Sequence, residues 1–476
     1  MSAQLSGNKG LALIEVMIAL GLFAFMVVSL WVLVFQAQDF LHNTSLRLAA
    51  AARVYGVIEA AVFDSFAHQF EPAAAISSSS TIAYVTPCLA RITENETWRS
   101  LSAHIMSAAG LVADVSEIKN RGLDCGGYPN DQQIGTVSTA AVSPSQLPAG
   151  LQATGIDIIK NTAFVSFISA DPLLPDLISA TIVTDQSGSR LTNERMIDVG
   201  SGLNSIDVAG GFVYGVRKDI VQQLVVIDAR HAATSGLSVA ASSTLPGVAG
   251  ASPEGFSIFY YDSRIYIGTK RTAGNEFHVF DVTNPYNPVW LGSREVNHNI
   301  NEIAVRREGQ QLFAFLATSG NTRDLIVLDV SNPSAITQIN SLDLPGNEDG
   351  RSLALMGHEL FVGRFKSTRG NPDFYKINLA EFFADPSRPL TTEVVMGSYT
   401  VGADVNTIRI THNRAFLGTA KMSQPFIVLN IASSTNMFVT ANAGAAAKIT
   451  ALDYQDNTLI GAVFGGENVI FIQPQQ

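Results

Sequence analysis

A long apolar stretch near the N-terminus is the first feature of the hydrophobic pattern. Residues 11–35 contain a single charged residue, Glu15. At about 1.5 Å per residue, a helix of this stretch would be about 37 Å long, enough to cross the bilayer core. The first proline is Pro72, and the alanine-rich continuation keeps apolar residues at helical spacing. We therefore predict one helix over 11–70, with residues 11–35 crossing a membrane.

A different pattern begins near residue 150. Short β-branched and aromatic runs alternate with turns rich in Gly, Asn, Asp and Pro, which is typical of strands. One unit recurs, an apolar strand that ends in a polar anchor residue, at intervals of 43 to 53 residues. The seven anchors are Asp185, Asp228, Asp281, Asp329, Asn378, Asn430 and Gln473.

Each anchored strand has neighbours before and after it, so the repeat holds four short strands per roughly 48 residues. This is typical of a β-propeller blade, and seven anchors predict seven blades. The chain ends three residues after Gln473, which leaves the last blade without an outer strand. A strand at 136–142 is expected to fill that place and to cover the free sheet edge. A β-sandwich or a tandem of small β domains fits the regular period less well.

The expected fold class is therefore a multi-domain α+β protein. It consists of a long N-terminal helix, a small region over 71–135 and an all-β propeller over 136–476. Residues 72–82 are expected to form a linker or a turn out of the long helix. The segment 100–120 places apolar residues on one helical face, so a helix is expected there.

Glu15 needs a counter-charge, since a carboxylate in a membrane helix is costly and usually functional. Cleavage of the chain after Gly10 would supply one, because Leu11 would become a positively charged N-terminus one helical turn from Glu15. An ordinary signal anchor or signal peptide is the alternative. The apolar run is longer than a secretory signal peptide requires.

The N-terminus contains Lys9-Gly10, followed by Leu11 and by the run Ile-Glu-Val-Met-Ile-Ala-Leu at 14–20. This segment resembles the class III signal of type IV prepilins and pseudopilins. The resemblance implies a leader over 1–10, cleavage by prepilin peptidase, methylation of Leu11 and a role for Glu15 in filament assembly. It also implies other pilins as partners and residence in the inner membrane before assembly. Leu11 replaces the usual Phe, and Val32 stands where many major pilins have proline. Both departures suit a minor pilin or a pseudopilin.

The two cysteines, Cys88 and Cys125, lie in the region after the predicted helix. Pilins often close a loop of their globular part with a disulfide, and the compartment beyond the membrane is oxidising. The resemblance therefore implies a Cys88–Cys125 bridge. Two unrelated buried thiols remain the alternative.

Two repeat units resemble the LVIVD-type propeller repeat most clearly. They are FDVTNPYNPVWLGS at 280–293 and LDVSNPSAITQINSLDLPG at 328–346. In both, an Asn-Pro step follows the anchored strand and favours a tight turn. The other units match by pattern only.

Candidate chemistry is sparse. The net charge of −11 argues against a nucleic-acid partner, which would require a basic face. The eight histidines form no metal-spaced pair, and no nucleophile elbow, phosphate-binding loop or zinc motif is present. We therefore expect no catalytic residue, no metal and no cofactor. The anchor residues are expected to cap turns, with ligand contact as the alternative.

These features together predict a minor type IV pilin. It would display the propeller outside the cell for adhesion or for binding an unknown surface ligand or protein. A domain of this size would be hard to repeat along a packed filament, so we expect it at the pilus tip. The alternative is a minor pilin or pseudopilin that primes a pilus or a periplasmic type II secretion filament. A surface-held enzyme is a third, less favoured hypothesis.

Overall fold

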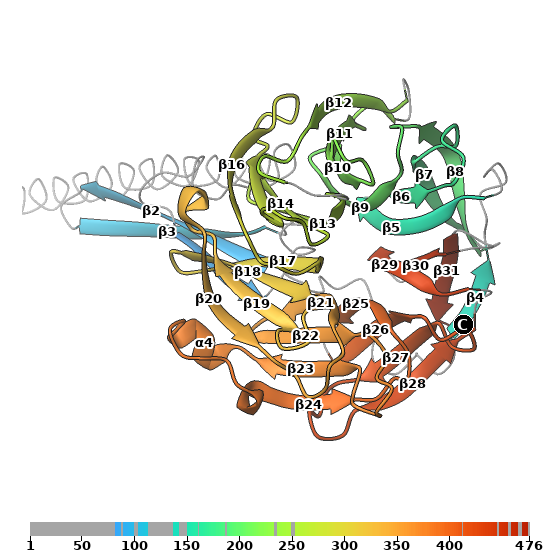
Figure 1. Cartoon of the computed structure of the whole chain (residues 1–476). Coiled ribbons are helices and arrows are strands. Elements are labelled where there is room, and N and C mark those ends of the chain that lie inside the picture. The colour runs from blue at the N-terminus through green and yellow to red at the C-terminus, as the bar shows by residue number, and fades with distance from the viewer. Residues whose placement is uncertain are drawn as a thin grey trace, which may run out of the picture. The chain divides into compact units, whose positions relative to one another are not determined.

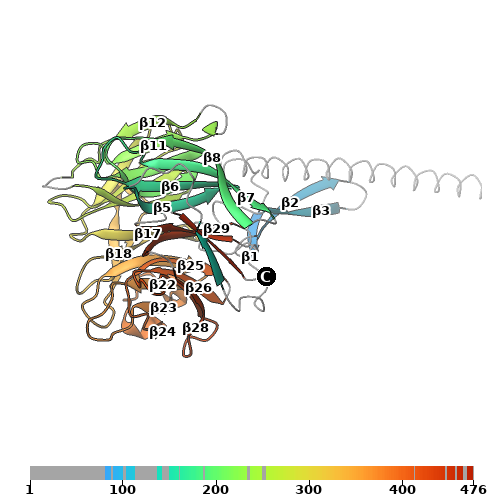
Figure 2. The same ribbon diagram turned by 90° about the vertical axis from the view of Figure 1, so that its right-hand side faces the viewer.

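The computed structural model contains a small three-stranded sheet and a larger all-β domain. The described residues are 81–86, 89–99, 103–112, 137–141 and 150–474, the last range with gaps at 160, 186–187, 233–235, 249–252, 412, 445–446, 456–457 and 465–468. The helix predicted over 11–70, including its membrane-crossing part, lies outside these residues. The described chain from residue 137 onward forms a seven-bladed β-propeller (Figure 1, and turned by 90° in Figure 2).

The region between the predicted helix and the propeller contains a three-stranded sheet. Its strands are β1 (Thr81–Thr86), β2 (Leu89–Arg99) and β3 (Ala103–Val112), in that order. The helix expected over 100–120 is therefore wrong for the part that β3 occupies. Ser107 and Gly110 lower the helix propensity of this segment, and pairing with β2 satisfies the backbone of β3.

Each blade of the propeller is a four-stranded antiparallel sheet, with three of its strands consecutive in the chain in every case. Blades 1 to 4 consist of β5 (Gln152–Ile159), β6 (Thr162–Ile168), β7 (Leu177–Asp185) and β8 (Gly188–Ile197); β9 (Leu203–Ala209), β10 (Phe212–Arg217), β11 (Leu224–Asp228) and β12 (Ser238–Ser243); β13 (Gly255–Tyr261), β14 (Arg264–Thr269), β15 (Phe277–Asp281) and β16 (Val289–Arg294); and β17 (Ile300–Glu308), β18 (Gln311–Thr318), β19 (Leu325–Asp329) and β20 (Thr337–Leu342).

Blades 5 and 6 repeat the same order, and blade 7 lacks a fourth strand of its own. Their strands are β21 (Gly350–Met356), β22 (Glu359–Arg364), β23 (Phe374–Asn378) and β24 (Val395–Tyr399); β25 (Val405–Thr411), β26 (Arg414–Thr419), β27 (Phe426–Asn430) and β28 (Phe438–Ala443); and β29 (Ile449–Gln455), β30 (Thr458–Val463) and β31 (Val469–Pro474). Short helices occur in connections, namely η1 (Pro333–Ala335), α4 (Ala380–Ala384) and η2 (Thr392–Val394).

The missing strand of blade 7 comes from the other end of the propeller. β4 (Val137–Ala141) pairs antiparallel with β31, from Ile470 opposite Ala141 to Pro474 opposite Val137. The closing strand predicted at 136–142 is therefore confirmed, as is the number of blades. Closure leaves no blade with an unfilled fourth position, so the ring has no open seam between its first and last blades.

The third strand of each blade is apolar because both of its faces are covered. In β19, the residues from Leu325 to Leu328 are buried and only the final Asp329 is partly exposed. One hydrophobic cluster joins Val327 of blade 4 to Leu353 and Tyr375 of blade 5. A continuous apolar run of four or five residues is what a strand buried between two layers requires. The cores of the propeller therefore lie between blades.

The first strands of the seven blades contact one another in a closed ring around the centre (Figure 1). Each first strand carries a β-bulge at the same position in its pairing with the second strand. A bulge adds one residue and locally disrupts the ladder. The side chains at this point are consequently available to a neighbouring blade.

One side chain from each bulge region donates a hydrogen bond to a backbone carbonyl at the start of the next blade's first strand. All seven distances lie between 2.5 and 2.9 Å. The donor and acceptor pairs are Thr154 to Leu203, Asn204 to Gly255, Ser257 to Ile300, Asn301 to Gly350, Ser352 to Val405, Asn406 to Ile449 and Thr450 to Ala153. We call this set the carbonyl ring.

The identity of the donor varies while the acceptor position stays constant. Where Phe256 or Arg351 occupies the bulge, the serine one residue later, Ser257 or Ser352, donates instead. The last bond, from Thr450 to Ala153, joins blade 7 to blade 1. The carbonyl ring is therefore complete across the point of closure.

Replacing Thr450 by Val should weaken this closure. Val keeps the branched shape but removes the hydroxyl, so the Ala153 carbonyl loses its donor, at a cost of about 1–3 kcal/mol in the free energy of unfolding. Chemical denaturation followed by tryptophan fluorescence measures this loss. Thr450→Ser should retain most of the stability. Thr337→Val, at an exposed position, is the matched control, and equal effects of the two Val substitutions would contradict the assigned role.

Candidate binding pocket on the upper face

We define the upper face of the propeller as the one that carries the connections between the second and third strands of each blade and from each fourth strand to the next blade. In five blades, a polar residue directly before the third strand is buried at this face. These residues, which we call bracket residues, are Asp176, Gln223, Glu276, Asp324 and Asp373. Buried polar groups require hydrogen-bond partners.

Each bracket residue accepts a hydrogen bond from backbone N–H groups that follow the fourth strand of its own blade. The donors are Val199 and Gly200 to Asp176, Leu245 to Gln223, Val296 and Asn297 to Glu276, Leu344 to Asp324 and Gly402 to Asp373, at 2.7–3.0 Å. Each bracket residue is buried in its own blade and holds the start of the connection that leads to the next blade. The sequence signal is one polar residue before the apolar third strand in these five blades, and its type is Asp, Gln or Glu.

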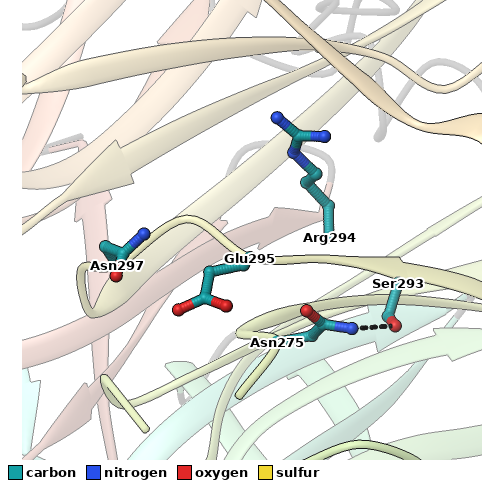
Figure 3. Close-up of a pocket in the computed structure, with 5 residues that line it drawn as sticks. All are labelled: Asn275, Ser293, Arg294, Glu295 and Asn297. Carbon is teal, nitrogen blue, oxygen red and sulfur yellow. Dashed lines mark hydrogen bonds between the residues drawn. The ribbon is translucent and has the colours of Figure 1, made fainter. Parts of the chain in front are cut away.

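A pocket with a cavity volume of about 420 Å³ lies at the upper face of blade 3 (Figure 3). Its lining residues come from two segments, the connection before β15 and the end of β16 with the residues after it. They are Asn275, Ser293, Arg294, Glu295 and Asn297. The Asn275 side chain donates to the Ser293 hydroxyl at 2.7 Å, which joins the two walls. We call this site the blade 3 pocket.

The bracket residue Glu276 holds both walls of the blade 3 pocket. Its Oε2 accepts from the N–H groups of Val296 (2.8 Å) and Asn297 (2.9 Å), and its Oε1 accepts from the N–H of Thr272 (3.1 Å). Asn297 has a φ of 65°, a left-handed conformation that asparagine tolerates better than most residues. The pocket loops are therefore fixed by one fully buried carboxylate.

His278, in β15, holds the backbone of the lining residue Asn275. Its side chain is buried, and Nε2 lies 2.9 Å from the carbonyl oxygen of Asn275. A carbonyl can only accept, so Nε2 carries the proton and Nδ1 is the unprotonated nitrogen. Nδ1 has no hydrogen-bond partner among the described residues. Burial lowers the pKa of His278 to about 4, so the imidazole is neutral at physiological pH.

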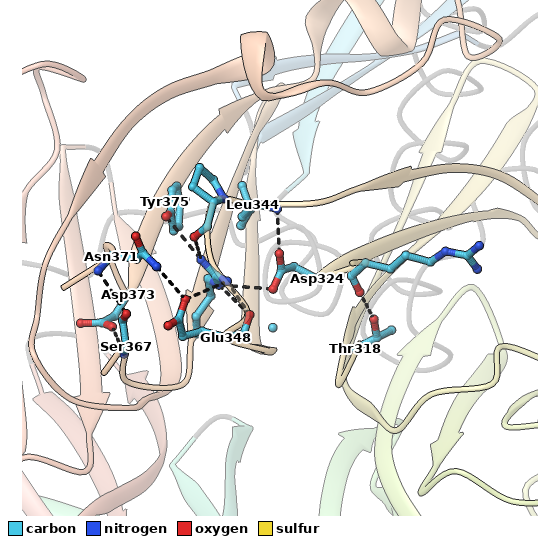
Figure 4. Close-up of polar contacts among 12 residues, drawn as sticks. Thr318, Asp324, Leu344, Glu348, Ser367, Asn371, Asp373 and Tyr375 are labelled. Carbon is cyan, nitrogen blue, oxygen red and sulfur yellow. Dashed lines mark hydrogen bonds and ion pairs between the residues drawn. The ribbon is translucent and has the colours of Figure 1, made fainter. Parts of the chain in front are cut away.

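A second polar cluster on the upper face surrounds Arg364, between blades 4 and 5, and includes Asp324 and Glu348 (Figure 4). The guanidinium is fully buried and donates to the backbone carbonyls of Pro345 (2.8 Å) and Glu348 (2.9 Å from Nε). Its Nε also lies 3.2 Å from Oδ1 of the bracket residue Asp324. Burial raises the pKa of the Asp324 carboxyl, and Arg364 acts against that rise. The cluster therefore encloses the Arg364 guanidinium completely and links blade 4 to blade 5.

The anchor residues predicted from the repeat lie at the opposite, lower face, where the third strands end. In five blades the anchor side chain accepts the N–H of the residue two positions later, at 2.8–3.0 Å. These anchors are Asp228, Asp281, Asp329, Asn378 and Asn430. Asp228 also pairs with Arg230 and accepts from Tyr286. The geometry is that of an Asx-turn, which starts the connection to the fourth strand.

Two anchors differ from this pattern. In blade 1, Thr181 pairs with Thr162 in the register where Asp228 pairs with Phe212 in blade 2. Asp185 lies four residues further on, in the extended hairpin of β7 with β8, because β7 is nine residues long. Gln473 lies one residue before the end of β31, at Pro474, and its side chain is outside the described residues.

The remaining predicted site residues, Gly10, Leu11, Glu15, Cys88 and Cys125, also lie outside the described residues. In the part of the chain that the structure describes, no helix combines the length and the apolar character needed to span a bilayer. Over the same residues, no cluster of three or more His, Cys, Asp or Glu side chains is arranged to hold a metal ion.

Comparison with known proteins supports the fold. Residues 312–343 match the LVIVD repeat, and they cover β18, β19, η1 and β20 of blade 4. The described propeller thus contains an LVIVD repeat, as the resemblance at 328–346 implied. None of the curated proteins compared with the chain matches it significantly.

Solved structures are similar at low sequence identity. A chain of the mitotic checkpoint complex has a TM-score of 0.50 and 12% identity, over 74% of this chain and 97% of that chain. The computationally designed Ika8 protein has a TM-score of 0.46 and 12% identity, over 71% and 100%. Raptor of Chaetomium thermophilum has a TM-score of 0.49 and 10% identity, over 72% and 28%. The similarity to the checkpoint chain shows a shared fold and nothing about function.

The buried, neutral His278 should make stability depend on pH. Its pKa is near 6.5 in the unfolded chain and about 4 in the folded one, so the unfolded chain binds more protons between these values. This contribution is fully present above pH 6.5 and is lost as the pH falls toward 4, by on the order of 3 kcal/mol. His278→Gln should flatten the dependence, measured by urea denaturation from pH 7 to pH 4. The exposed His231→Gln is the matched control, and identical pH profiles for the two variants would refute the assignment.

Removing Arg364 should destabilise the upper face strongly. Arg364→Met leaves Asp324 buried without its counter-charge, with an expected loss of about 3–5 kcal/mol in the free energy of unfolding. Asp324→Asn, added to Arg364→Met, should recover part of this loss, because the buried side chain is then uncharged. Denaturation of the wild type, both single variants and the double variant measures the coupling. Strictly additive effects would rule out a direct interaction.

Proposed function

We propose that this protein is a minor type IV pilin that displays its propeller as a binding module, at or near the tip of a pilus. The proposal joins the prepilin-like segment, with Gly10, Leu11 and Glu15, to the closed propeller that follows it. In this proposal the module acts by binding and not by catalysis. The propeller faces the extracellular space, and the N-terminal helix contacts other pilins after residence in the inner membrane.

The observation that carries the proposal is the way the ring closes. β4 enters the propeller from the N-terminal side and completes blade 7, which also contains the last described strand, β31. The propeller is therefore a self-contained unit that is joined to the preceding chain by one covalent connection. A closed unit on a single tether is suited to display on a filament.

The size and the surface of the propeller support a low copy number. A domain over 136–476 on every subunit would be difficult to accommodate along a closely packed shaft. The upper face, in turn, presents a polar pocket whose walls are fixed by Glu276 and His278. A rigid, preformed pocket favours recognition of a ligand over packing between pilin subunits.

Immunogold labelling with an antibody to residues 150–476 tests the position in the filament. Label at the tips, with a mature N-terminus at Leu11 by mass spectrometry, is the expected result. Glu15→Val should abolish incorporation while leaving cleavage after Gly10 intact, because the carboxylate that would pair with the Leu11 amine is removed. Glu59→Gln, later in the same predicted helix, is the control.

Three outcomes would count against the proposal. Uniform labelling along the shaft would exclude the tip position. A mature N-terminus other than Leu11 would exclude the pilin assignment. Loss of all filaments when the protein is deleted would favour the alternative, in which the protein primes assembly of a pilus or a secretion filament.

A further inference from the structure

We propose that the blade 3 pocket binds a neutral saccharide. The inference rests on the proposed binding function and specifies the ligand class of its pocket. Three properties of the site support it: the chemistry of the lining side chains, their charge balance and the fixed backbone of the two walls.

The lining offers hydrogen-bond donors and acceptors side by side. Asn275 and Asn297 are amides, each with a donor and an acceptor group, and Ser293 contributes a hydroxyl that has both functions. Glu295 can only accept and Arg294 can only donate. Each hydroxyl group of a sugar also donates and accepts, so adjacent hydroxyls can pair with this alternating set. None of the lining residues supplies an apolar side chain for a hydrophobic anchor.

The charge balance disfavours strongly charged ligands. Arg294 and Glu295 contribute one charge of each sign, so the rim has no net charge. Glu276 adds a buried carboxylate that is hydrogen-bonded to the wall backbone, and three N–H groups already occupy its oxygens. A phosphate or sulfate would therefore meet a nearby negative charge with a single guanidinium to offset it. A neutral, polyhydroxylated ligand avoids that cost.

The walls are preorganised for recognition. The Asn275 amide donates to Ser293, and the Asn275 carbonyl accepts from His278. Glu276 holds the backbone of Val296 and Asn297 on the opposite wall. The backbone of both walls is therefore fixed before a ligand binds, and such preorganisation lowers the entropic cost of association.

The test uses the full chain in a detergent without a sugar headgroup. Glucose, galactose, mannose, N-acetylglucosamine and lactose are screened by saturation-transfer-difference NMR, and the dissociation constant of any that binds is measured by calorimetry. Glu295→Gln and Ser293→Ala, singly and combined, probe the pocket. Asp343→Asn is the matched control, because Asp343 is the exposed acidic residue that follows β20 as Glu295 follows β16. All variants are first compared with the wild type by thermal denaturation.

The expected result is binding of at least one sugar, weakened at least about tenfold in the combined pocket variant and unchanged in Asp343→Asn. Absence of binding to every sugar, equal binding by pocket and control variants, or preference for inorganic phosphate over all the sugars would each overturn the inference. The filament proposal has separate readouts, namely the Leu11 N-terminus and the labelling position. Tip labelling without sugar binding would therefore remove the ligand assignment and leave the filament proposal standing.

Discussion

The carbonyl ring is the constraint on which the propeller depends. Each blade is a separate sheet, and the first strands of neighbouring blades are not joined by a backbone ladder. A side chain at each bulge donates a hydrogen bond to the next blade, and Thr450 donates the one that joins the last blade to the first. Apolar packing between blades is non-directional. Hydrogen bonds of fixed geometry at seven equivalent positions set the spacing of the blades and leave the outer loops free to vary.

The bracket residues also use hydrogen bonds between a side chain and the backbone, at the upper face. A buried polar side chain inside each of five blades fixes the connection that leads to the next blade, so the loops inherit the rigidity of the sheets. Blade 3 uses this device to build a pocket, because Glu276 accepts from both loops and His278 holds Asn275. Blade 4 uses Asp324 differently, because this carboxylate lies beside the fully buried guanidinium of Arg364 from blade 5.

The repeat made most of the propeller predictable. An apolar run with an anchor such as Asp281 or Asp329 recurs because each third strand is buried on both faces and then turns, and the period gave both the blade number and the closing strand. Asp185 ends its strand as the repeat predicts, but it lies four residues beyond the register position of the other anchors, which Thr181 occupies, because β7 is longer. The pocket could not be predicted from the sequence. Asn275 and Asn297 are far apart in the chain and line one pocket only in the folded blade, and the bracket residue is Asp, Glu or Gln in different blades. The N-terminal assignment stays a prediction from sequence.

Closure by β4 also has a mechanical consequence. Any pull that reaches the propeller from the N-terminal side enters through β4, whose five residue pairs with β31 are the first to bear the load. The next strand in the chain is β5 of blade 1, whose Ala153 belongs to the carbonyl ring, so the ring bears no load while β4 stays paired. Under tension β4 would therefore detach from β31 first, and only then would the load reach β5 of blade 1 and the carbonyl ring.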